Sequence, residues 1–143
     1  MVPFFVNDVP IECINQAAIS YHVPATYIIS ILKMEGGKNG LKSPNKDGTY
    51  DYGPMQINSR WLSTVATYGY TEYDLQFNPC ANVAVGTWIL AKEIADGQTI
   101  WNGVGNYHSH TAALNLGYGQ KAQRIHNWLL KVINSGSEKR PQK

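Results

Sequence analysis

Two acidic residues are the strongest candidates for chemistry in this 143-residue chain. Glu35 lies four residues after Ile31 and seven after Ile28, which places it on the apolar stripe of a predicted helix. Burial and the negative end of a helix dipole both disfavour a charged carboxylate, so we expect a raised pKa for Glu35. A carboxyl group that stays protonated near neutral pH can donate a proton to a leaving group. The alternative is a Glu35 side chain that bends out at the helix end into solvent.

Asp51 is the second candidate, because it stands between two tyrosines on a predicted strand. From a strand it could face a cleft opposite Glu35, and paired carboxyl groups are what cleavage of a glycosidic bond requires. The alternative is an ordinary strand residue that faces solvent. The sequence alone leaves both readings of Asp51 open.

Other chemistries find little support in the sequence. A calcium loop that begins at Ser43 would need an acid at its twelfth position, where Pro54 stands. His108 and His110 could form a metal pair, but no third ligand follows at a recognisable spacing. No glycine-rich phosphate loop and no nucleophile motif is visible. We therefore expect neither a metal nor another cofactor.

The elements that must position these residues are mostly helical. Apolar residues recur at helical spacing in six segments: residues 11–21, 24–36, 58–68, 78–97, 99–107 and a last stripe over 122–133. One segment breaks this pattern, since an Asp47-Gly48 turn is followed by an alternating Tyr-Asp-Tyr run that is typical of a hairpin. The predicted fold class is mainly α (α+β), a helical domain with one small β-hairpin.

The composition limits the number of domains and the classes of partner that the chain could have. With 43% hydrophobic and 15% charged residues, the chain is expected to form one domain over residues 1–133, followed by a disordered polar tail over residues 134–143. A net charge of +2 is too weak to indicate nucleic-acid binding. The longest apolar stretches are far shorter than the ~18 residues that span a bilayer. We expect a monomer without a transmembrane segment.

The two cysteines bear on location. Cys13 and Cys80 are far apart, with no CxxC motif and no set of zinc ligands. They are either free cysteines in the core or one disulfide formed in an oxidising compartment. The first residues lack the basic start and long apolar stretch of a signal peptide. The chain is therefore either cytosolic or a mature segment with a starting methionine.

Four segments in a fixed order resemble a known family: Lys33 to Gly37, Tyr52 to Asn58, Asn78 to Gly86 and Val104 to His108. The chain is similar to the lytic transglycosylases with a lysozyme-like SLT domain, glycoside hydrolase family 23. Within that family it resembles the small enzymes associated with type III and type IV secretion, conjugation and pilus systems. The resemblance covers about residues 10 to 130 and implies a lysozyme-like fold.

The resemblance also implies roles for individual residues. Glu35 stands where the family has its catalytic acid and base, although Glu-Gly replaces the usual Glu-Ser. Pro54 replaces Leu in the Gly-Leu-Met-Gln motif that lines the sugar cleft, and His108 replaces Asn in the Ala-Tyr-Asn motif. Tyr118 is the nearest tyrosine to the one that opens the family's last helix. The implied substrate contacts are Tyr52, Met55, Gln56, Asn58, Tyr107, His108 and Tyr118.

The same resemblance implies how the two cysteines pair. Some secretion-associated members carry a cysteine pair that joins the first helix to the Asn-Pro helix, and Cys13 and Cys80 match it. This implies a disulfide and a periplasmic location, with the signal peptide absent from this sequence.

The activity implied by the resemblance is cleavage of the β-1,4 bond from N-acetylmuramic acid to N-acetylglucosamine. The 6-hydroxyl of the muramic sugar closes on its own anomeric carbon, with Asp51 stabilising the positive charge that develops. Such an enzyme would open the cell wall locally for a secretion, conjugation or pilus apparatus, so its partners would be peptidoglycan glycan strands and that apparatus. The alternatives are a hydrolytic muramidase of the same fold, and a non-catalytic peptidoglycan-binding or assembly factor.

Overall fold

The computed structural model describes residues 4–109 and 112–138. Within these ranges it contains seven α-helices, one short 3₁₀ helix (η1) and five short strands. In chain order they are β1 Phe5–Val6, β2 Val9–Pro10, α1 Ile11–Tyr21, α2 Ala25–Glu35, β3 Lys42–Pro44, β4 Tyr50–Tyr52, β5 Ile57–Asn58, η1 Ser59–Trp61, α3 Leu62–Ala66, α4 Glu72–Phe77, α5 Pro79–Gly97, α6 Ile100–His108 and α7 Ala112–Glu138. The predicted mainly α class is confirmed.

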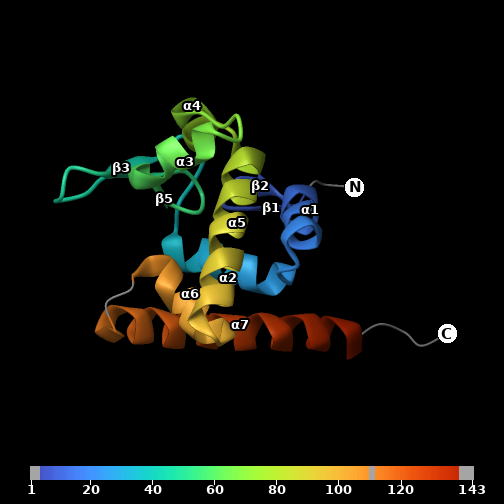
Figure 1. The fold of residues 1–143 in the computed structure, drawn as a ribbon. Helices are drawn as coiled ribbons and strands as arrows, with labels where there is room; N and C mark the ends of the chain where they lie inside the picture. Colours follow the sequence, from blue (N-terminus) through green and yellow to red (C-terminus); the bar gives the residue numbers. More distant parts are fainter. Residues whose placement is uncertain (1–3, 110–111, 139–143) are drawn as a thin grey trace.

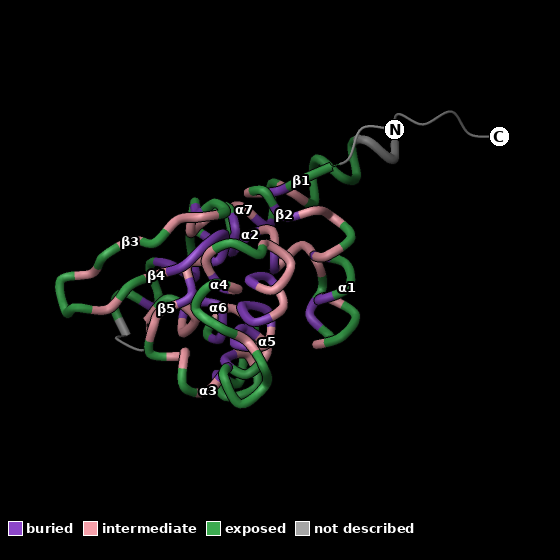
Figure 2. Tube along the Cα trace, turned by 90° about the horizontal axis from the view of Figure 1, so that it is seen from above, coloured by how far each residue is buried: buried purple, intermediate pink, exposed green. Residues whose placement is uncertain are grey.

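Helix α5 forms the centre of the molecule (Figure 1). Helices α1, α4 and α6 pack against it, and α7 packs across α2 and α6. Val83 and Leu90 of α5 are fully buried, as are Ile28 and Leu32 of α2. Figure 2 shows these buried segments gathered in the middle, with exposed chain around them. The arrangement fixes the C-terminal end of α2 beside α7, where Glu35 contacts Tyr118.

Local sequence signals determine where the central helices begin and end. The Asn78 side chain accepts a hydrogen bond from the backbone of Ala81, and Pro79 takes the first helical position, as predicted. Thr99 caps α6 in the same way. Gly36 ends α2 in a left-handed conformation, φ +62°, that glycine adopts without strain. Pro24, predicted as the first residue of α2, directly precedes it.

The predicted hairpin is present and has a third strand beside it. Strand β4 pairs antiparallel with β3, where Ser43 faces Asp51, and with β5, where Asn58 faces Asp51. The third strand was not predicted because its two residues are too few to show an alternating pattern. Asp51 therefore lies on the central strand of a small sheet.

Two other small elements were also missed. Strands β1 and β2 form a tight hairpin with Asn7 and Asp8 at its turn, both at positive φ. Helix α4 begins with a capping box in which Thr71 and Asp74 each accept a hydrogen bond from the other's backbone. The Thr-x-x-Asp spacing was a readable signal for this helix start.

Helix α7 is longer than predicted at both ends. It begins at Ala112, ahead of the apolar stripe, and it continues through residues 134–138, where the sequence predicted a disordered tail. Extending an existing helix adds one hydrogen bond per residue at little cost, and the disordered tail over residues 134–143 stays a prediction. At the other end, Gly105 and Gly119 let α6 and α7 approach closely: a Cβ on Gly105 would collide with Asn115. Residues 139–143 lie outside the described ranges.

A disulfide joins Cys13 of α1 to Cys80 of α5, which confirms the predicted pairing. The bond closes a loop across 67 positions and ties the first helix to the central one. In the two described ranges, no helix has the length and apolar character needed to cross a bilayer.

Candidate functional site

A cleft of about 590 Å³ opens between the small sheet and the ends of α2 and α6. Six of the residues predicted for the site line it: Glu35, Asp51, Gln56, Asn58, Tyr107 and His108. They come from α2, the sheet, the turn between β4 and β5, and α6, so the fold brings together residues that are up to 73 positions apart.

Glu35 is the last residue of α2 and is partly buried in the wall of the cleft. Its pKa is raised to about 7, first by burial, which penalises the charged form. The negative charge of Asp51 raises this pKa further, whereas a hydrogen bond from Tyr118 lowers it. These surroundings favour the interpretation that Glu35 is a partly buried acid rather than a freely solvated side chain. With its pKa near neutrality, the carboxyl group can exchange a proton in either direction near pH 7.

Tyr118 supports Glu35 from behind the cleft. It is buried on α7, and its hydroxyl donates a hydrogen bond to Glu35 Oε2 over 3.3 Å. Burial and the nearby Glu35 charge hold the pKa of Tyr118 far above its usual range, so the hydroxyl keeps its proton. The exposed ring of His108 stacks on the tyrosine ring at 4.6 Å between centroids. Tyr118 thus contacts the acid but does not line the cleft.

Tyr107 lines the cleft from α6. Its hydroxyl donates a hydrogen bond of 2.8 Å to the backbone carbonyl of Met55. Burial, followed by the negative charges of Glu35 and Asp51, raises the pKa of Tyr107 well above its ordinary value. Tyr107 is therefore a fixed neutral donor that joins α6 to the segment after β4.

Asp51 lines the same cleft from β4 and is held by its partner strand. The Asn58 side-chain amide donates to Asp51 Oδ1 over 3.1 Å and also to Thr49 Oγ1 over 3.0 Å. The Asn58 carbonyl oxygen in turn accepts from the backbone of Arg60 and caps η1. Asn58 therefore orients the second carboxylate rather than serving only as a surface for a ligand.

Gln56 is also fixed in place. Its backbone has a positive φ of 53°, which is uncommon for a residue with a side chain. The amide group donates to the Gly53 carbonyl over 2.9 Å and accepts from the Ser43 hydroxyl over 3.0 Å. The nitrogen and the oxygen of the Gln56 amide thus join the turn after β4 to strand β3.

Tyr52 and Met55 lie in the core and do not line the cleft. Neither side chain offers a surface to the cleft, and their contact with substrate stays a prediction. Met55 fills the space beside Gly86 of α5, where any Cβ would collide with its sulfur. The motif residue is therefore a packing residue that sets the position of the segment carrying Gln56.

Asn82 of α5 is a positioning residue that the sequence analysis missed. It is fully buried, and its amide nitrogen donates to the backbone carbonyls of Tyr52 and Leu75 over 2.9 and 2.8 Å. Its carbonyl oxygen accepts from the backbone of Met55 over 2.9 Å. Its signal in the sequence was a polar residue among the apolar positions of a central helix. Buried amides of this kind need all their partners, so Asn82 fixes the segment between the two cleft walls.

Part of the cleft lining was not predicted from the sequence. The additional residues are Asn45, Lys46, Asp47, Thr49, Ile57, Arg60, Trp61 and Ile89. Trp61 packs edge-on against Trp88 at 5.8 Å, which fixes an indole ring beside the polar groups of the cleft. A cleft lined by many polar groups and one such ring suits an extended, hydroxyl-rich ligand.

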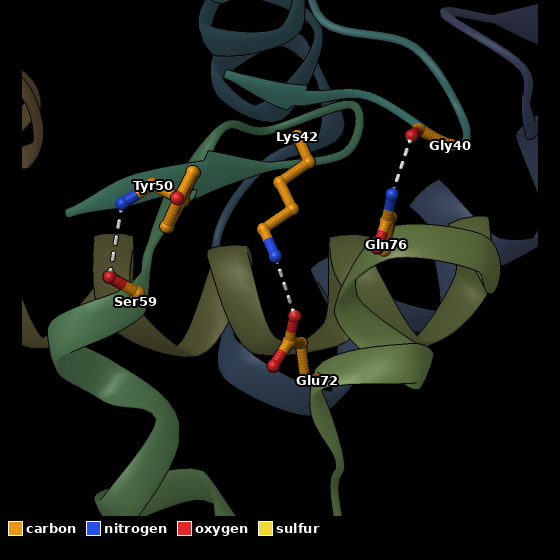
Figure 3. Close-up of polar contacts among 6 residues, drawn as sticks. All are labelled: Gly40, Lys42, Tyr50, Ser59, Glu72 and Gln76. Atoms are coloured by element: carbon orange, nitrogen blue, oxygen red, sulfur yellow. Dashed lines mark hydrogen bonds and ion pairs between the residues drawn. The ribbon is translucent and has the colours of Figure 1, made fainter. Parts of the chain in front are cut away.

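The outer edge of the sheet is anchored to the helices below it (Figure 3). Lys42 of β3 forms an ion pair of 3.1 Å with Glu72 at the start of α4. The Gln76 side chain donates to the Gly40 carbonyl over 2.9 Å, and the backbone of Tyr50 donates to the Ser59 hydroxyl over 3.1 Å. The ion pair is exposed and contributes little by itself, whereas the Gln76 hydrogen bond to Gly40 is partly buried.

In the part of the chain that the structure describes, no three His, Cys, Asp or Glu residues gather into a group that could hold a metal ion. His110, the second member of the suggested histidine pair, lies outside the described residues.

Comparison with known proteins adds independent evidence. Residues 12–131 match the family model described as the transglycosylase SLT domain. The invasion protein IagB of Salmonella typhimurium is 31% identical over 108 residues, covering 75% of this chain and 68% of that protein. A peptidoglycan-binding-like protein of Escherichia coli O157:H7 is 30% identical over 135 residues, covering 85% and 80%. Protein IpgF of Shigella flexneri is 29% identical over 102 residues, covering 71% and 67%.

Proposed function

The chain belongs to the transglycosylase SLT domain family, and on that premise we propose that it is a peptidoglycan lytic transglycosylase. The proposed reaction cleaves the β-1,4 bond from N-acetylmuramic acid to N-acetylglucosamine and leaves a 1,6-anhydro end. The observation that carries the proposal is the Glu35 carboxyl group, which lies in the cleft wall with a pKa raised to about 7. Such a group can act both as an acid and as a base near neutral pH.

The reaction needs one carboxyl group in two successive roles. Protonated Glu35 gives its proton to the glycosidic oxygen, and the bond from the anomeric carbon to that oxygen breaks. The carboxylate then removes the proton from the 6-hydroxyl of the muramic sugar, whose oxygen forms the new bond to the anomeric carbon. Glu35 ends protonated, as it began, so atoms and protons balance without water.

Tyr118 fits this cycle through its single contact with the acid. Its hydroxyl donates to Oε2 of Glu35, which leaves Oε1 for the substrate. A donor at the second oxygen stabilises the carboxylate after proton transfer and limits how far burial raises the pKa. This is a positioning role, because Tyr118 acts through Glu35.

Asp51 supplies negative charge to the same cleft. In the proposed mechanism it stabilises the oxocarbenium-like state, in which positive charge builds on the muramic ring. Its presence also favours a second candidate function, a hydrolytic muramidase, since a second carboxylate can position a water molecule. The two functions share Glu35 and differ in the acceptor that attacks the anomeric carbon.

Product analysis tests the proposal directly. Purified peptidoglycan is digested with the protein, and the soluble muropeptides are analysed by mass spectrometry. Anhydro ends support the transglycosylase and reducing ends identify a hydrolase. Pelleting of the protein with peptidoglycan, without release of fragments, would instead indicate a binding or assembly factor. A Glu35→Gln digest serves as the control for contaminating enzymes.

We further propose that the protein acts in the periplasm and opens the wall locally for a secretion, conjugation or pilus apparatus. The support is twofold: disulfides persist in oxidising compartments, and one relative is named an invasion protein. The test is fractionation of the producing cells, with free thiols blocked before lysis. Protein found in the periplasmic fraction with Cys13 and Cys80 paired supports the location, and reduced protein in the cytoplasm refutes it.

A further inference from the structure

The C-terminal half of α7 carries large apolar side chains that nothing in the described chain covers. Tyr118, Ala122 and His126 lie along one side of the helix and are buried against the body. Past His126 the exposed fractions are 58% for Trp128, 40% for Leu130, 49% for Val132 and 51% for Ile133. The helix continues beyond the body here (Figure 1), and Figure 2 colours this stretch mostly as exposed up to residue 135.

These residues form a continuous surface, here called the α7 apolar face, made of Trp128, Leu129, Leu130, Val132 and Ile133. Trp128 and Val132 are one turn apart, as are Leu129 and Ile133. The opposite side carries polar residues at the same spacing: Arg124, Asn127, Lys131 and Asn134. This half of α7 is therefore amphipathic, although it packs against little of the protein.

The charges of the chain are divided unevenly around the same place. Residues 121–143 hold six of the 12 Lys and Arg residues but one of the 10 acidic residues, a net charge of +5. The 120 residues before them hold six basic and nine acidic residues, a net charge of −3. Lys121, Arg124 and Lys131 of the described helix belong to the basic group. Such an asymmetry indicates an anionic partner for the helix end.

We propose that this end of α7 binds an anionic lipid surface and lies along it, with the α7 apolar face inserted. A helix with Trp, Leu, Val and Ile on one side and Lys and Arg on the other matches the requirements for an interfacial helix. Charge alone would also attract nucleic acid or a wall polymer, but neither gives a reason to expose a tryptophan and three aliphatic side chains. The proposal is independent of the function proposed for the cleft.

The test uses the full chain and two kinds of lipid vesicle. Vesicles with one-third phosphatidylglycerol in phosphatidylcholine are compared with pure phosphatidylcholine by co-sedimentation. We expect binding to the anionic vesicles that weakens as salt is added, and much weaker binding to the neutral ones. Arg124→Gln and Lys131→Gln should each weaken binding to anionic vesicles by about fivefold.

Variants of the apolar face separate insertion from simple charge attraction. Trp128→Gln combined with Ile133→Gln leaves the net charge unchanged and should reduce vesicle binding strongly. Ile19→Gln, at a site on α1 that is 77% exposed, is the matched control and should bind as the parent does. Thermal unfolding and turnover of soluble glycan fragments should stay unchanged in all three proteins, which shows that they are folded.

Several outcomes would overturn the proposal. The first is an absence of vesicle binding by the parent protein, and the second is a double variant that still binds as the parent does. A third is a parent protein that is a dimer in light scattering and does not bind vesicles, with a double variant that is a monomer. That result would assign the α7 apolar face to a second copy of the chain. A fourth is a double variant that loses binding to lipid-free peptidoglycan but keeps binding to vesicles. That result would assign the α7 apolar face to the cell wall.

Discussion

The two walls of the cleft hold their carboxyl groups by different means. Glu35 ends a buried helix, and its hydrogen-bond partner Tyr118 is 83 positions away in the sequence. Asp51 lies on a small sheet, and its partner Asn58 is 7 positions away. The helical wall therefore depends on how α2 and α7 pack, whereas the sheet wall is built from one short stretch of chain. Distant packing shelters the acid, and local hydrogen bonds orient the second carboxylate.

The largest expected effect comes from removing the acid of the helical wall. Glu35→Gln keeps the shape of the side chain but has no proton to exchange, so turnover of peptidoglycan should fall by about 10²- to 10⁴-fold. Release of soluble muropeptides measures it. Binding to insoluble peptidoglycan, measured by pelleting, should remain. A variant that still releases fragments at the parent's rate would show that Glu35 is not the acid.

The next effect concerns Asn82, which fixes the segment between the two walls. Asn82→Ala leaves three buried backbone groups without partners, so the free energy of unfolding should fall by roughly 3 kcal/mol. Asn78→Ala is the control at the exposed start of the same helix and should cost about 1 kcal/mol. Urea unfolding measures both. Equal losses would mean that the buried amide does not fix the segment.

A smaller effect on turnover is expected from the sheet wall. Asp51→Asn removes the negative charge but keeps the contact with Asn58, and turnover should fall roughly 10- to 100-fold while glycan binding persists. Asp47→Asn on the same hairpin also lines the cleft and is the matched control, with little expected change. The rates are compared at pH 5 to 6, where Glu35 is mostly protonated in each protein. Unchanged turnover in the Asp51 variant would remove Asp51 from the mechanism.

The helical wall should also make stability depend on pH in a defined direction. The folded protein raises the pKa of Glu35 from 4.5 to about 7, so it binds a proton more tightly than the unfolded chain does. The stability due to this group is present below pH 4.5 and is lost as pH rises through 7. Relative to the parent, Glu35→Gln should gain on the order of 1 kcal/mol at pH 8, after allowance for solvent screening, and nothing at pH 4. Urea unfolding at both values tests this, and an equal difference at both would contradict it.

The smallest effect comes from the contact between α7 and the acid. The Tyr118 hydroxyl lowers the pKa of Glu35, so Tyr118→Phe should raise that pKa by less than about one unit. Activity that needs protonated Glu35 should then persist to higher pH, and the alkaline limb of the rate profile should move up. Tyr73→Phe, an exposed tyrosine on α4, is the control. A limb that stays in place, or moves down, would argue against the contact.

The sequence was informative wherever the deciding signal is local. Asn78 and Pro79 begin a helix, and Gly36 ends one, because caps act on neighbouring backbone groups. The position of Glu35 on an apolar stripe indicated a sheltered carboxyl group. Local signals were weaker for elements of two residues, such as β5, and for the glycine-containing start of α7, where packing overrides propensity.

Residue types alone did not separate site from core. Met55 and Tyr52 belong to the motif that resembles a sugar cleft, yet both are buried, whereas Trp61 and Arg60 line the cleft without having been predicted. Which of two neighbouring side chains faces a ligand depends on the turn that carries them. Here that turn is fixed by Asn82, from a helix that follows later in the chain.

The sequence by itself determined a mainly helical domain, a hairpin that carries Asp51 and a helix that ends in an acid. Only the tertiary structure decided that Tyr118 reaches that acid, that both carboxyl groups share one cleft, and how far the pKa of Glu35 rises. The physical reason is how far apart in the sequence the interacting residues lie. Helix ends and turns depend on bonds between residues a few positions apart, whereas burial and a contact across 83 positions exist only once the helices have packed.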